Sequence, residues 1–278
     1  MALRDSLSVW QDRTMDIGFI GLGSMGTRMV ELLLDAGHHL TLWARRPASL
    51  DPFASRCDSA TSPFELGATS ELVGICVWDE HDVDEVLLGD LGVFAGMRPG
   101  GIVAVHSTIA PAACVRLSDE ATRHGLELID APVSVGSSLP KLLVMVGGEV
   151  RAVERCRQTF DSFGAPVLRL GPVGSGQIAK LVNNTLLAAT AGLADDAIAL
   201  GEALGLDAEA LTKALSSGSS RGTWSTLLAS RPVLGTKGRT QEWAQKDVEL
   251  MASLTSDAHV DRGSEVLRLG ARGVDVMG

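Results

Sequence analysis

The sequence predicts an α/β protein in which a doubly wound domain over residues 15–174 is followed by an all-α domain over residues 175–278. Two observations support this division. Short apolar runs alternate with amphipathic stretches as far as about Leu170, and a single long helical pattern replaces that alternation after Gly176. Buried strands that alternate with helices form βαβ units with a mainly parallel sheet.

Seven apolar runs of strand length supply the predicted sheet, and amphipathic segments between them supply its helices. The strands are predicted at Ile17–Ile20, Leu40–Trp43, Val73–Trp78, Ile102–Val105, Leu126–Ile129, Leu142–Val146 and Val167–Leu170. The helices of this domain are predicted at Met25–Leu34, Pro111–His124 and Val150–Phe160.

The second domain is predicted to contain helices alone. Apolar residues recur at helical spacing from Ile178 to Leu204, and Gly205-Leu206-Asp207 then resembles a helix stop followed by a new N-cap. Further helices are predicted at Ala208–Leu215 and Glu242–Leu254. The segment Ser216–Thr240, rich in Ser, Gly, Arg and Pro, is the predicted long loop.

Composition excludes several classes of function. The 278 residues carry a net charge of −10, which argues against a nucleic-acid or anionic-membrane partner. No apolar run reaches the roughly 20 residues of a membrane span, and Met1–Thr14 lacks the apolar stretch of a signal peptide. These first residues are polar and unpatterned, so we expect a disordered extension. Four scattered cysteines without metal-ligand spacing indicate a reducing compartment, the cytoplasm, and no bound metal.

A glycine-rich turn lies between the first predicted strand and the first predicted helix. Gly21, Gly23 and Gly26 form GxGxxG, in which the glycines allow a tight turn, close approach to a pyrophosphate and close helix–strand packing. The helix N-terminus then offers free N–H groups to phosphates. The whole turn, Gly21, Leu22, Gly23, Ser24, Met25 and Gly26, is the predicted dinucleotide cradle of a Rossmann-like domain. A plain structural turn is the alternative.

The residues after the second strand predict which dinucleotide is bound. NAD-binding domains usually place Asp or Glu there to accept from the ribose hydroxyls. This chain has Ala44, Arg45 and Arg46 instead, and two guanidiniums suit a 2′-phosphate. We therefore predict NADP(H), with NAD possible. The alternative is a pair of solvated surface arginines.

The start of the long helix predicts proton chemistry. Lys180 lies in its first turns, with Asn183 and Asn184 three and four residues further on and therefore on the same face. A lysine accepts protons near neutral pH only when its pKa falls from ~10.4, and burial, a helix N-terminus and an oxidised nicotinamide all lower it. Ser175 or Gly176 is expected to cap the helix. A surface lysine beside two asparagines is the alternative.

Taken in order, the motifs resemble those of the β-hydroxyacid dehydrogenases, which include 3-hydroxyisobutyrate dehydrogenase and tartronate semialdehyde reductase. The resemblance covers the chain from about Met15 to Gly278. It depends on GFIGLGSMG at Gly18–Gly26, HSTIAP at His106–Pro111, DAPVS at Asp130–Ser134, GPVGSGQIAKLVNN at Gly171–Asn184 and QKDVEL at Gln245–Leu250.

The resemblance implies an NADP-dependent hydride transfer to or from a small 3-hydroxy acid or its semialdehyde. It implies that Lys180 is the general acid/base and that Ser134, Gly136 and Asn184 bind the substrate. It places Thr108 and Lys246 at the cofactor, with Asp247 steadying Lys246. Family members assemble through the helical domain, so a homodimer or homotetramer is implied.

Departures from the family pattern leave two other functions open. Val135 replaces a glycine that approaches the substrate, and Pro140 interrupts a segment that is a helix of small residues in the family. The pocket for the non-reacting end of the substrate is therefore expected to differ. An imine or ketone reductase of the same architecture is one alternative, and a non-catalytic NADP-binding protein is the other. His106 is interpreted as a structural residue.

Overall fold

The computed structural model describes residues 15–135, 140–223, 239–257 and 264–277. The chain divides into two compact units, Met1–Lys180 and Leu181–Gly278. This division falls inside a helix, six residues after the boundary at residue 174 that the sequence predicts. The predicted extension Met1–Thr14 lies outside the described residues.

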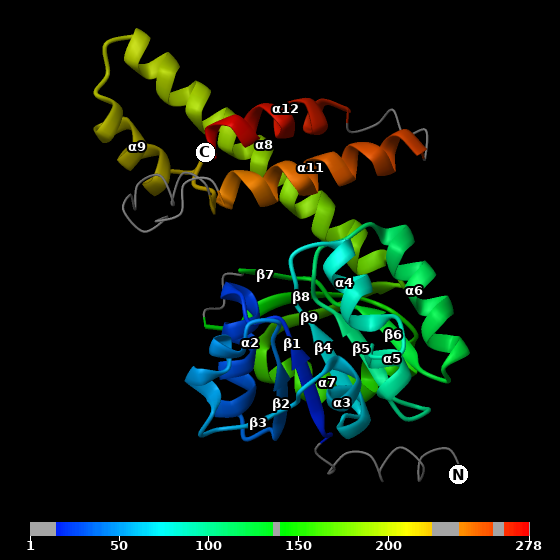
Figure 1. The fold of residues 1–278 in the computed structure, drawn as a ribbon. Helices are drawn as coiled ribbons and strands as arrows, with labels where there is room; N and C mark the ends of the chain where they lie inside the picture. The colour runs from blue at the N-terminus through cyan, green and yellow to red at the C-terminus, as the bar shows by residue number, and fades with distance from the viewer. Residues whose placement is uncertain (1–14, 136–139, 224–238, 258–263, 278) are drawn as a thin grey trace, which may run out of the picture. The chain divides into compact units, whose positions relative to one another are not determined.

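The first unit is built on a sheet with nine strands among the described residues (Figure 1). Its order is β3-β2-β1-β4-β5-β6-β8-β7, with β9 also paired to β8. The strands from β3 to β6 are parallel, whereas β8 runs antiparallel to β6 and β7. Their bounds are β1 (Ile17–Ile20), β2 (Leu40–Trp43), β3 (Asp58–Ser59), β4 (Leu72–Ile75), β5 (Ile102–Val105), β6 (Glu127–Asp130), β7 (Val133–Val135), β8 (Leu142–Gly147) and β9 (Gly164–Gly171).

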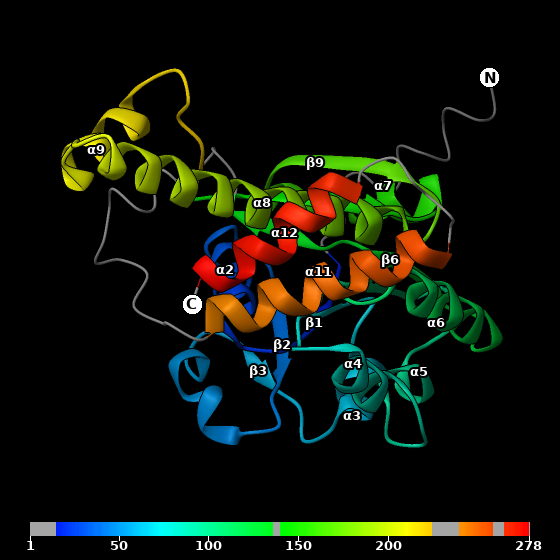
Figure 2. The ribbon, with the colours of Figure 1, turned by 90° about the horizontal axis from the view of Figure 1, so that it is seen from above.

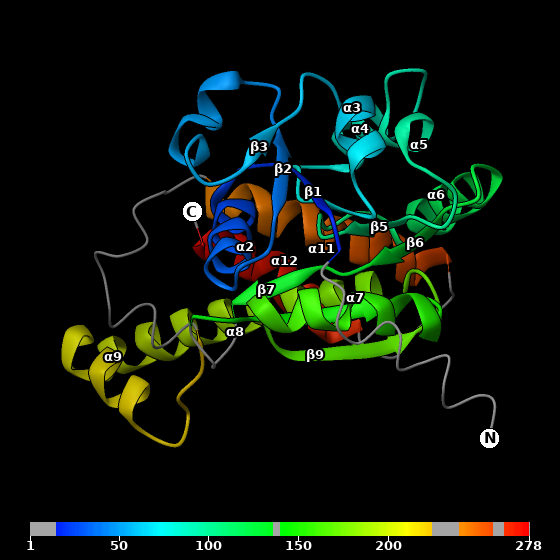
Figure 3. The same cartoon turned by 90° about the horizontal axis from the view of Figure 1, so that it is seen from below.

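Helices cover both faces of this sheet, which confirms the predicted fold class (Figures 1 and 3). The described helices of the unit are α2 (Ser24–Asp35), α3 (Pro63–Thr69), α4 (Glu80–Leu87), α5 (Val93–Gly96), α6 (Pro111–Arg123) and α7 (Val150–Phe163). Adjacent strand residues point to opposite faces. Phe19 therefore joins the core under α2 and α7, and Ile20 joins the core under α3 to α6.

The carboxyl ends of five parallel strands lie in one row. Ile20 is in register with Trp43 on β2 and with Ile75 on β4. Ile75 pairs with Val105 on β5, which pairs with Asp130 on β6. The strand order reverses between β1 and β4, and ligands of doubly wound sheets bind at the carboxyl edge of such a reversal.

Four described helices make up most of the second unit: α8 (Ser175–Ala203), α9 (Ala208–Ser217), α11 (Arg239–Asp257) and α12 (Ser264–Val276). The first residues of α8 belong to the first unit. Helices α11 and α12 run side by side (Figure 2), and α12 crosses α8 so closely that a Cβ on Gly273 would lie 1.7 Å from the Ala188 carbonyl oxygen. No helix that the structure describes is long and apolar enough to cross a membrane.

Several elements of both units were not predicted from the sequence. Strand β3 is two exposed residues, β7 overlaps the end of the DAPVS motif, and α3, α4, α5 and α12 were not predicted. The predicted run Val73–Trp78 ends as a strand at Ile75. The predicted loop Ser216–Thr240 loses both ends to α9 and α11, and residues 224–238 lie outside the described part.

Candidate functional site

The three glycines of the turn between β1 and α2 differ in their steric surroundings. Gly21 has a φ of +103°, and a Cβ there would lie 2.1 Å from the Cys76 carbonyl oxygen. A Cβ on Gly26 would lie 1.8 Å from the Gly21 carbonyl oxygen, so only glycine allows α2 to approach the turn. Gly23 differs, because a Cβ there would meet no heavy atom within 4 Å.

The open space at Gly23 lies where a phosphate would approach the backbone. Gly23 is the N-cap of α2 and makes no side-chain capping bond. The first N–H groups of a helix have no partner within it and favour anions. Leu22, Ser24 and Met25, which complete the turn, are half-buried or exposed, and the first turn of α2 has no acidic residue. These residues fit the pyrophosphate of a dinucleotide.

The two predicted arginines differ in their surroundings. Arg45 donates from Nη2 to Asp82 Oδ1 (2.7 Å) and to Glu85 Oε2 (2.6 Å), both on α4. Arg46 is exposed and forms no ion pair within the described part of the chain. Arg45 is therefore already held by two carboxylates, whereas the Arg46 guanidinium faces solvent.

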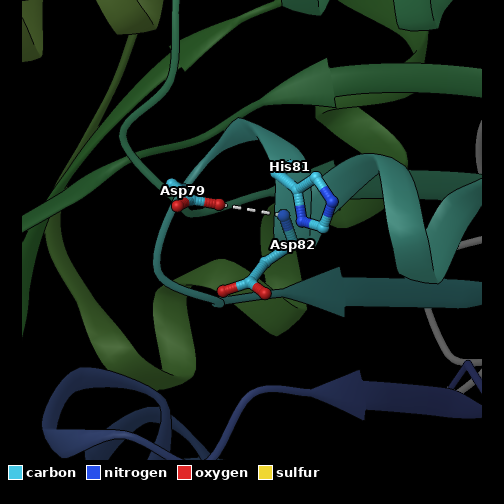
Figure 4. A group of neighbouring side chains, drawn as sticks. All are labelled: Asp79, His81 and Asp82. Atoms are coloured by element: carbon cyan, nitrogen blue, oxygen red, sulfur yellow. Dashed lines mark hydrogen bonds between the residues drawn. The ribbon is translucent and has the colours of Figure 1, made fainter.

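The acidic start of α4 forms a cluster that the sequence did not reveal (Figure 4). A carboxylate oxygen of Asp79, a ring nitrogen of His81 and a carboxylate oxygen of Asp82 all lie within 4.8 Å of one another. Asp79 is the N-cap of α4, and its Oδ1 accepts from the Asp82 N–H (2.9 Å). The Asp79 carboxylate is therefore engaged by the helix start, and the Asp82 carboxylate is engaged by Arg45.

Lys180 lies on the first turns of α8 and is half-buried. Burial raises the pKa of the Cys76 thiol to about 12, and the nearby positive charge of Lys180 opposes this. Cys76 follows β4 directly, and its carbonyl oxygen is the atom that a Cβ on Gly21 would meet. The amine of Lys180 is thus near the carboxyl edge of the sheet, beside the glycine-rich turn.

A buried carboxylate from the neighbouring strand fixes the N-terminus of α8. Asp130, at the end of β6, accepts from the Gly174 N–H at Oδ1 (2.7 Å) and from the Gln177 N–H at Oδ2 (2.8 Å). The helix begins at Ser175, so Asp130 does the work that was expected of a local cap at Ser175 or Gly176. Burial raises the pKa of Asp130 to about 6, and the hydrogen bonds from Gly174 and Gln177 oppose this shift.

The Gln177 side chain joins α8 to the segment after β5, where the sequence places Thr108. Its Nε2 donates to the Ser107 carbonyl (2.8 Å), and its Oε1 accepts from the Ile109 N–H (3.2 Å). The Ser107 hydroxyl in turn accepts from the Val77 N–H (2.8 Å), just after β4. Gln177 is fully buried, whereas Thr108 between its two partners is half-buried.

His106 is enclosed in the core of the first unit. Its Nδ1 lies 2.7 Å from the Ala131 carbonyl oxygen, and the rings of Phe19, Phe160 and Phe163 surround it. Burial lowers its pKa to about 4. These surroundings support the structural interpretation of this histidine.

Ser134 lies in the middle of β7, opposite Leu143 of β8, and is half-buried. Its neighbour Val135 is 55% exposed and points to the other face of the strand, away from Ser134. Gly136 lies outside the described residues. Where the chain resumes, Arg28 of α2 donates from Nε to the Pro140 carbonyl (2.9 Å).

In the second unit, side chains from α8 and α11 form a polar chain. Asn184 is buried and donates from Nδ2 to Asp247 Oδ2 (2.6 Å), while its Oδ1 accepts from Asn183 Nδ2 (3.0 Å). Lys246 Nζ lies 3.6 Å from Asp247 Oδ1. Asp247 therefore contacts both Asn184 and Lys246. Trp243 packs against the small core of this unit, and Trp224 lies outside the described residues.

The roles of three residues, Arg45, Asp130 and Gln177, could not be predicted from the sequence. The pairing of Arg45 with α4 could not be seen because α4 itself was not predicted. Asp130 and Gln177 lie within recognisable motifs. A single sequence does not show, however, that the carboxylate of Asp130 accepts from the Gly174 N–H, 44 residues later at the start of α8.

Both halves of the chain match families of nicotinamide-dependent enzymes. Residues 16–171 match the family described as the NAD binding domain of 6-phosphogluconate dehydrogenase. Residues 174–266 match the family described as the NAD-binding domain of NADP-dependent 3-hydroxyisobutyrate dehydrogenase. The two matches follow each other in the order that the two units have in the chain.

Two bacterial relatives and one solved structure agree with these families. An NAD-dependent L-serine dehydrogenase of Pseudomonas aeruginosa is 36% identical over 75% of this chain and 71% of its own length. A 3-hydroxyisobutyrate dehydrogenase of the same species is 33% identical, with the same coverage of both chains. The structure of a Mycobacterium tuberculosis 3-hydroxyisobutyrate dehydrogenase with L-serine has a TM-score of 0.77 at 24% identity, covers 95% of this chain and 93% of its own, and supports the fold.

Proposed function

Because the chain belongs to the β-hydroxyacid dehydrogenase family, oxidoreductases that use a nicotinamide cofactor, we propose that it interconverts a small 3-hydroxy acid and its semialdehyde with NADP(H). The observation that carries this proposal is the place of Lys180. Its charge acts on Cys76, the residue whose backbone closes against the glycine-rich turn. A proton-handling amine thus lies close to the dinucleotide cradle.

When bound, the nicotinamide accepts or supplies the hydride. Lys180 takes the proton of the substrate hydroxyl during oxidation and returns it during reduction, as a general base or acid. The glycine-rich turn and the N-terminus of α2 hold the phosphates, and Thr108 and Lys246 contact the cofactor. These roles follow the family pattern at positions that this chain retains.

Ser134 and Asn184 orient the substrate, and Gly136 contributes its backbone. A 3-hydroxy acid presents a carboxylate and a hydroxyl, which suit a serine hydroxyl and an asparagine amide. Asp247 accepts from Asn184 Nδ2 in the described structure, which fixes the orientation of that amide. Fixed donors and acceptors keep the reacting carbon in place, and such positioning contributes much of the rate in hydride transfer.

Arg46 reads the 2′-phosphate of NADP(H). Its guanidinium is exposed, whereas Arg45 is engaged by Asp82 and Glu85 and can contribute only by leaving or sharing those carboxylates. This difference supports NADP(H) through one free arginine and explains why Arg45 has the smaller role.

The proposal is tested by mixing purified protein with NADP or NAD and a panel of substrates, and by following the absorbance of the reduced cofactor. The panel contains L-serine, 3-hydroxyisobutyrate and other 3-hydroxy acids, together with aldehydes and imines. Turnover of 3-hydroxy acids with NADP is expected. Reduction of imines alone would overturn the proposal, and so would cofactor binding without turnover.

A further inference from the structure

The amide of Gln177 is buried and has no role in the proposed function. It lies three residues before Lys180 on α8 and is 0% exposed. Its two hydrogen bonds go to the carbonyl of Ser107 and to the N–H of Ile109. A buried amide whose donor and acceptor are both satisfied by backbone on another element fixes the distance and direction between the two.

These bonds bracket Thr108 from both sides. The Ser107 carbonyl precedes Thr108 and the Ile109 N–H follows it, so the Gln177 amide pairs with this stretch as a neighbouring strand would. Two further hydrogen bonds fix the residues on either side of this contact. The Gln177 N–H donates to the Asp130 carboxylate, and the Val77 N–H donates to the Ser107 hydroxyl. The ends of β4, β5 and β6 are thereby tied to the first turn of α8.

We propose that Gln177 is a positioning residue that holds Thr108 in register with Lys180. The inference rests on the proposed function, in which Thr108 contacts the cofactor and Lys180 transfers the proton. Loss of the amide would free the backbone on both sides of Thr108, and a misplacement of ~1 Å at a reacting centre can cost ~100-fold in rate. Cofactor affinity and turnover should therefore both depend on a residue that touches neither ligand.

The first test replaces Gln177 by methionine, which has a similar length and no amide. Hydrogen exchange of the Ile109 amide should accelerate because its acceptor is gone. The Kd for NADPH, measured by fluorescence titration, should rise about 3- to 10-fold, and kcat should fall about 10- to 100-fold. Thr185→Val is the matched control, since Thr185 is buried on the same helix and its hydroxyl has no hydrogen bond among the described residues.

Gln177→Glu provides a second variant that retains the shape of the side chain. A protonated glutamic acid donates one O–H and accepts at its other oxygen, whereas an ionised one only accepts. The neighbouring titratable groups are the Cys114 thiol of α6, which contacts this side chain, and the Asp130 carboxylate of β6, which accepts from the Gln177 backbone N–H. Burial of the side chain and the charge of Asp130 both disfavour an ionised glutamate here. This variant should bind NADPH like the wild type at about pH 6 and like Gln177→Met at about pH 9.

The outcomes separate this inference from the proposed function. Hydrogen exchange and NADPH affinity are measured without any substrate. If the wild type turns over no 3-hydroxy acid, the proposed function is wrong, but these two measurements still test the role of Gln177. Faster exchange together with weaker NADPH binding in Gln177→Met supports the positioning role. If the variant only melts at a lower temperature while exchange at Ile109, Kd and kcat stay at wild-type values, the inference is wrong. Failure of Gln177→Glu to lose NADPH affinity at high pH would contradict it as well.

Discussion

At the scale of single residues, the proposed chemistry depends on the amine of Lys180. Lys180 is half-buried on α8, and its charge reaches the Cys76 thiol beside the glycine-rich turn. The sequence left open whether Lys180 was a solvated surface lysine. Its proximity to Cys76 and the buried anchor of its helix at Asp130 favour the chemical role.

Replacing Lys180 by alanine should lower kcat by roughly 10²- to 10⁴-fold, the usual contribution of a general acid or base. NADPH affinity should hardly change, because in the proposed mechanism the amine acts on the substrate hydroxyl, whereas the turn from Gly21 to Gly26 and the arginines bind the cofactor. Steady-state kinetics and fluorescence titration measure the two effects. Lys213→Ala on α9 serves as the control, since Lys213 is exposed and plays no part in the site. Near-normal kcat in Lys180→Ala would make an imine reductase the better hypothesis.

The two arginines give a second prediction at this scale. Wild-type protein should bind NADPH at least ~10-fold more tightly than NADH, which corresponds to ~1.4 kcal/mol. Arg46→Ala should remove this preference, whereas Arg45→Ala should reduce it less because Asp82 and Glu85 already hold that guanidinium. NADH affinity is the internal control and should stay constant in both variants. Equal affinities of the wild type for the two cofactors would show that neither arginine reads the phosphate.

At the scale of elements, the junction between β6 and α8 carries a buried charge with a measurable effect on stability. Asp130 is fully buried and accepts two backbone hydrogen bonds, yet burial raises its pKa from 3.8 to about 6. The folded protein therefore binds a proton here more tightly than the unfolded chain does. The contribution of Asp130 to the free energy of unfolding is largest at acidic pH and falls as the pH rises through about 6.

Asp130→Asn removes this titration, so we expect its free energy of unfolding to vary differently with pH. Between about pH 4 and 6 its slope should be more positive than that of the wild type, by up to ~1.4 kcal/mol per pH unit. His106, whose pKa is lowered to about 4 by burial, has the opposite effect, but it is common to both proteins and cancels in the comparison. Denaturant unfolding at several pH values gives the slopes. Parallel slopes would show that Asp130 does not titrate in this range.

Elements with strong periodicity could be predicted, and elements defined by contacts could not. The strands Ile17–Ile20, Leu40–Trp43 and Ile102–Val105 have the predicted bounds because each is a short buried apolar run. The strand β7 and the helix α4 are only three and eight residues long, so the edge position of Ser134 and the acids that hold Arg45 came only from the structure. The glycine-rich turn was predictable because its three glycines each meet a local steric requirement.

At the scale of the whole molecule, the two units differ in how much apolar surface they bury. The first has two extensive cores on the faces of its sheet, whereas the described core of the second is small and half of it is alanine: Ala188, Ala191 and Ala244. Several large apolar side chains of α8 remain exposed instead: Val182, Leu186, Leu193 and Leu200. Contiguous apolar surface of this kind usually marks an interaction site.

We expect this face of α8 to be covered by a second copy of the chain, in a homodimer or homotetramer. An isologous contact repeats the same patch on both partners, so one substitution acts twice in each interface. Leu193, which is 49% exposed within the stretch Leu186–Ile198, is the position at which we test this interface. Leu193→Glu should shift the sedimentation coefficient towards that of a monomer, because two unpaired carboxylates would be buried in the interface. The matched control is Leu91→Glu, since Leu91 is 71% exposed on the first unit and lies outside this face. Wild-type protein that sediments as a monomer at micromolar concentration would exclude the assembly, and the exposed leucines would then need another partner.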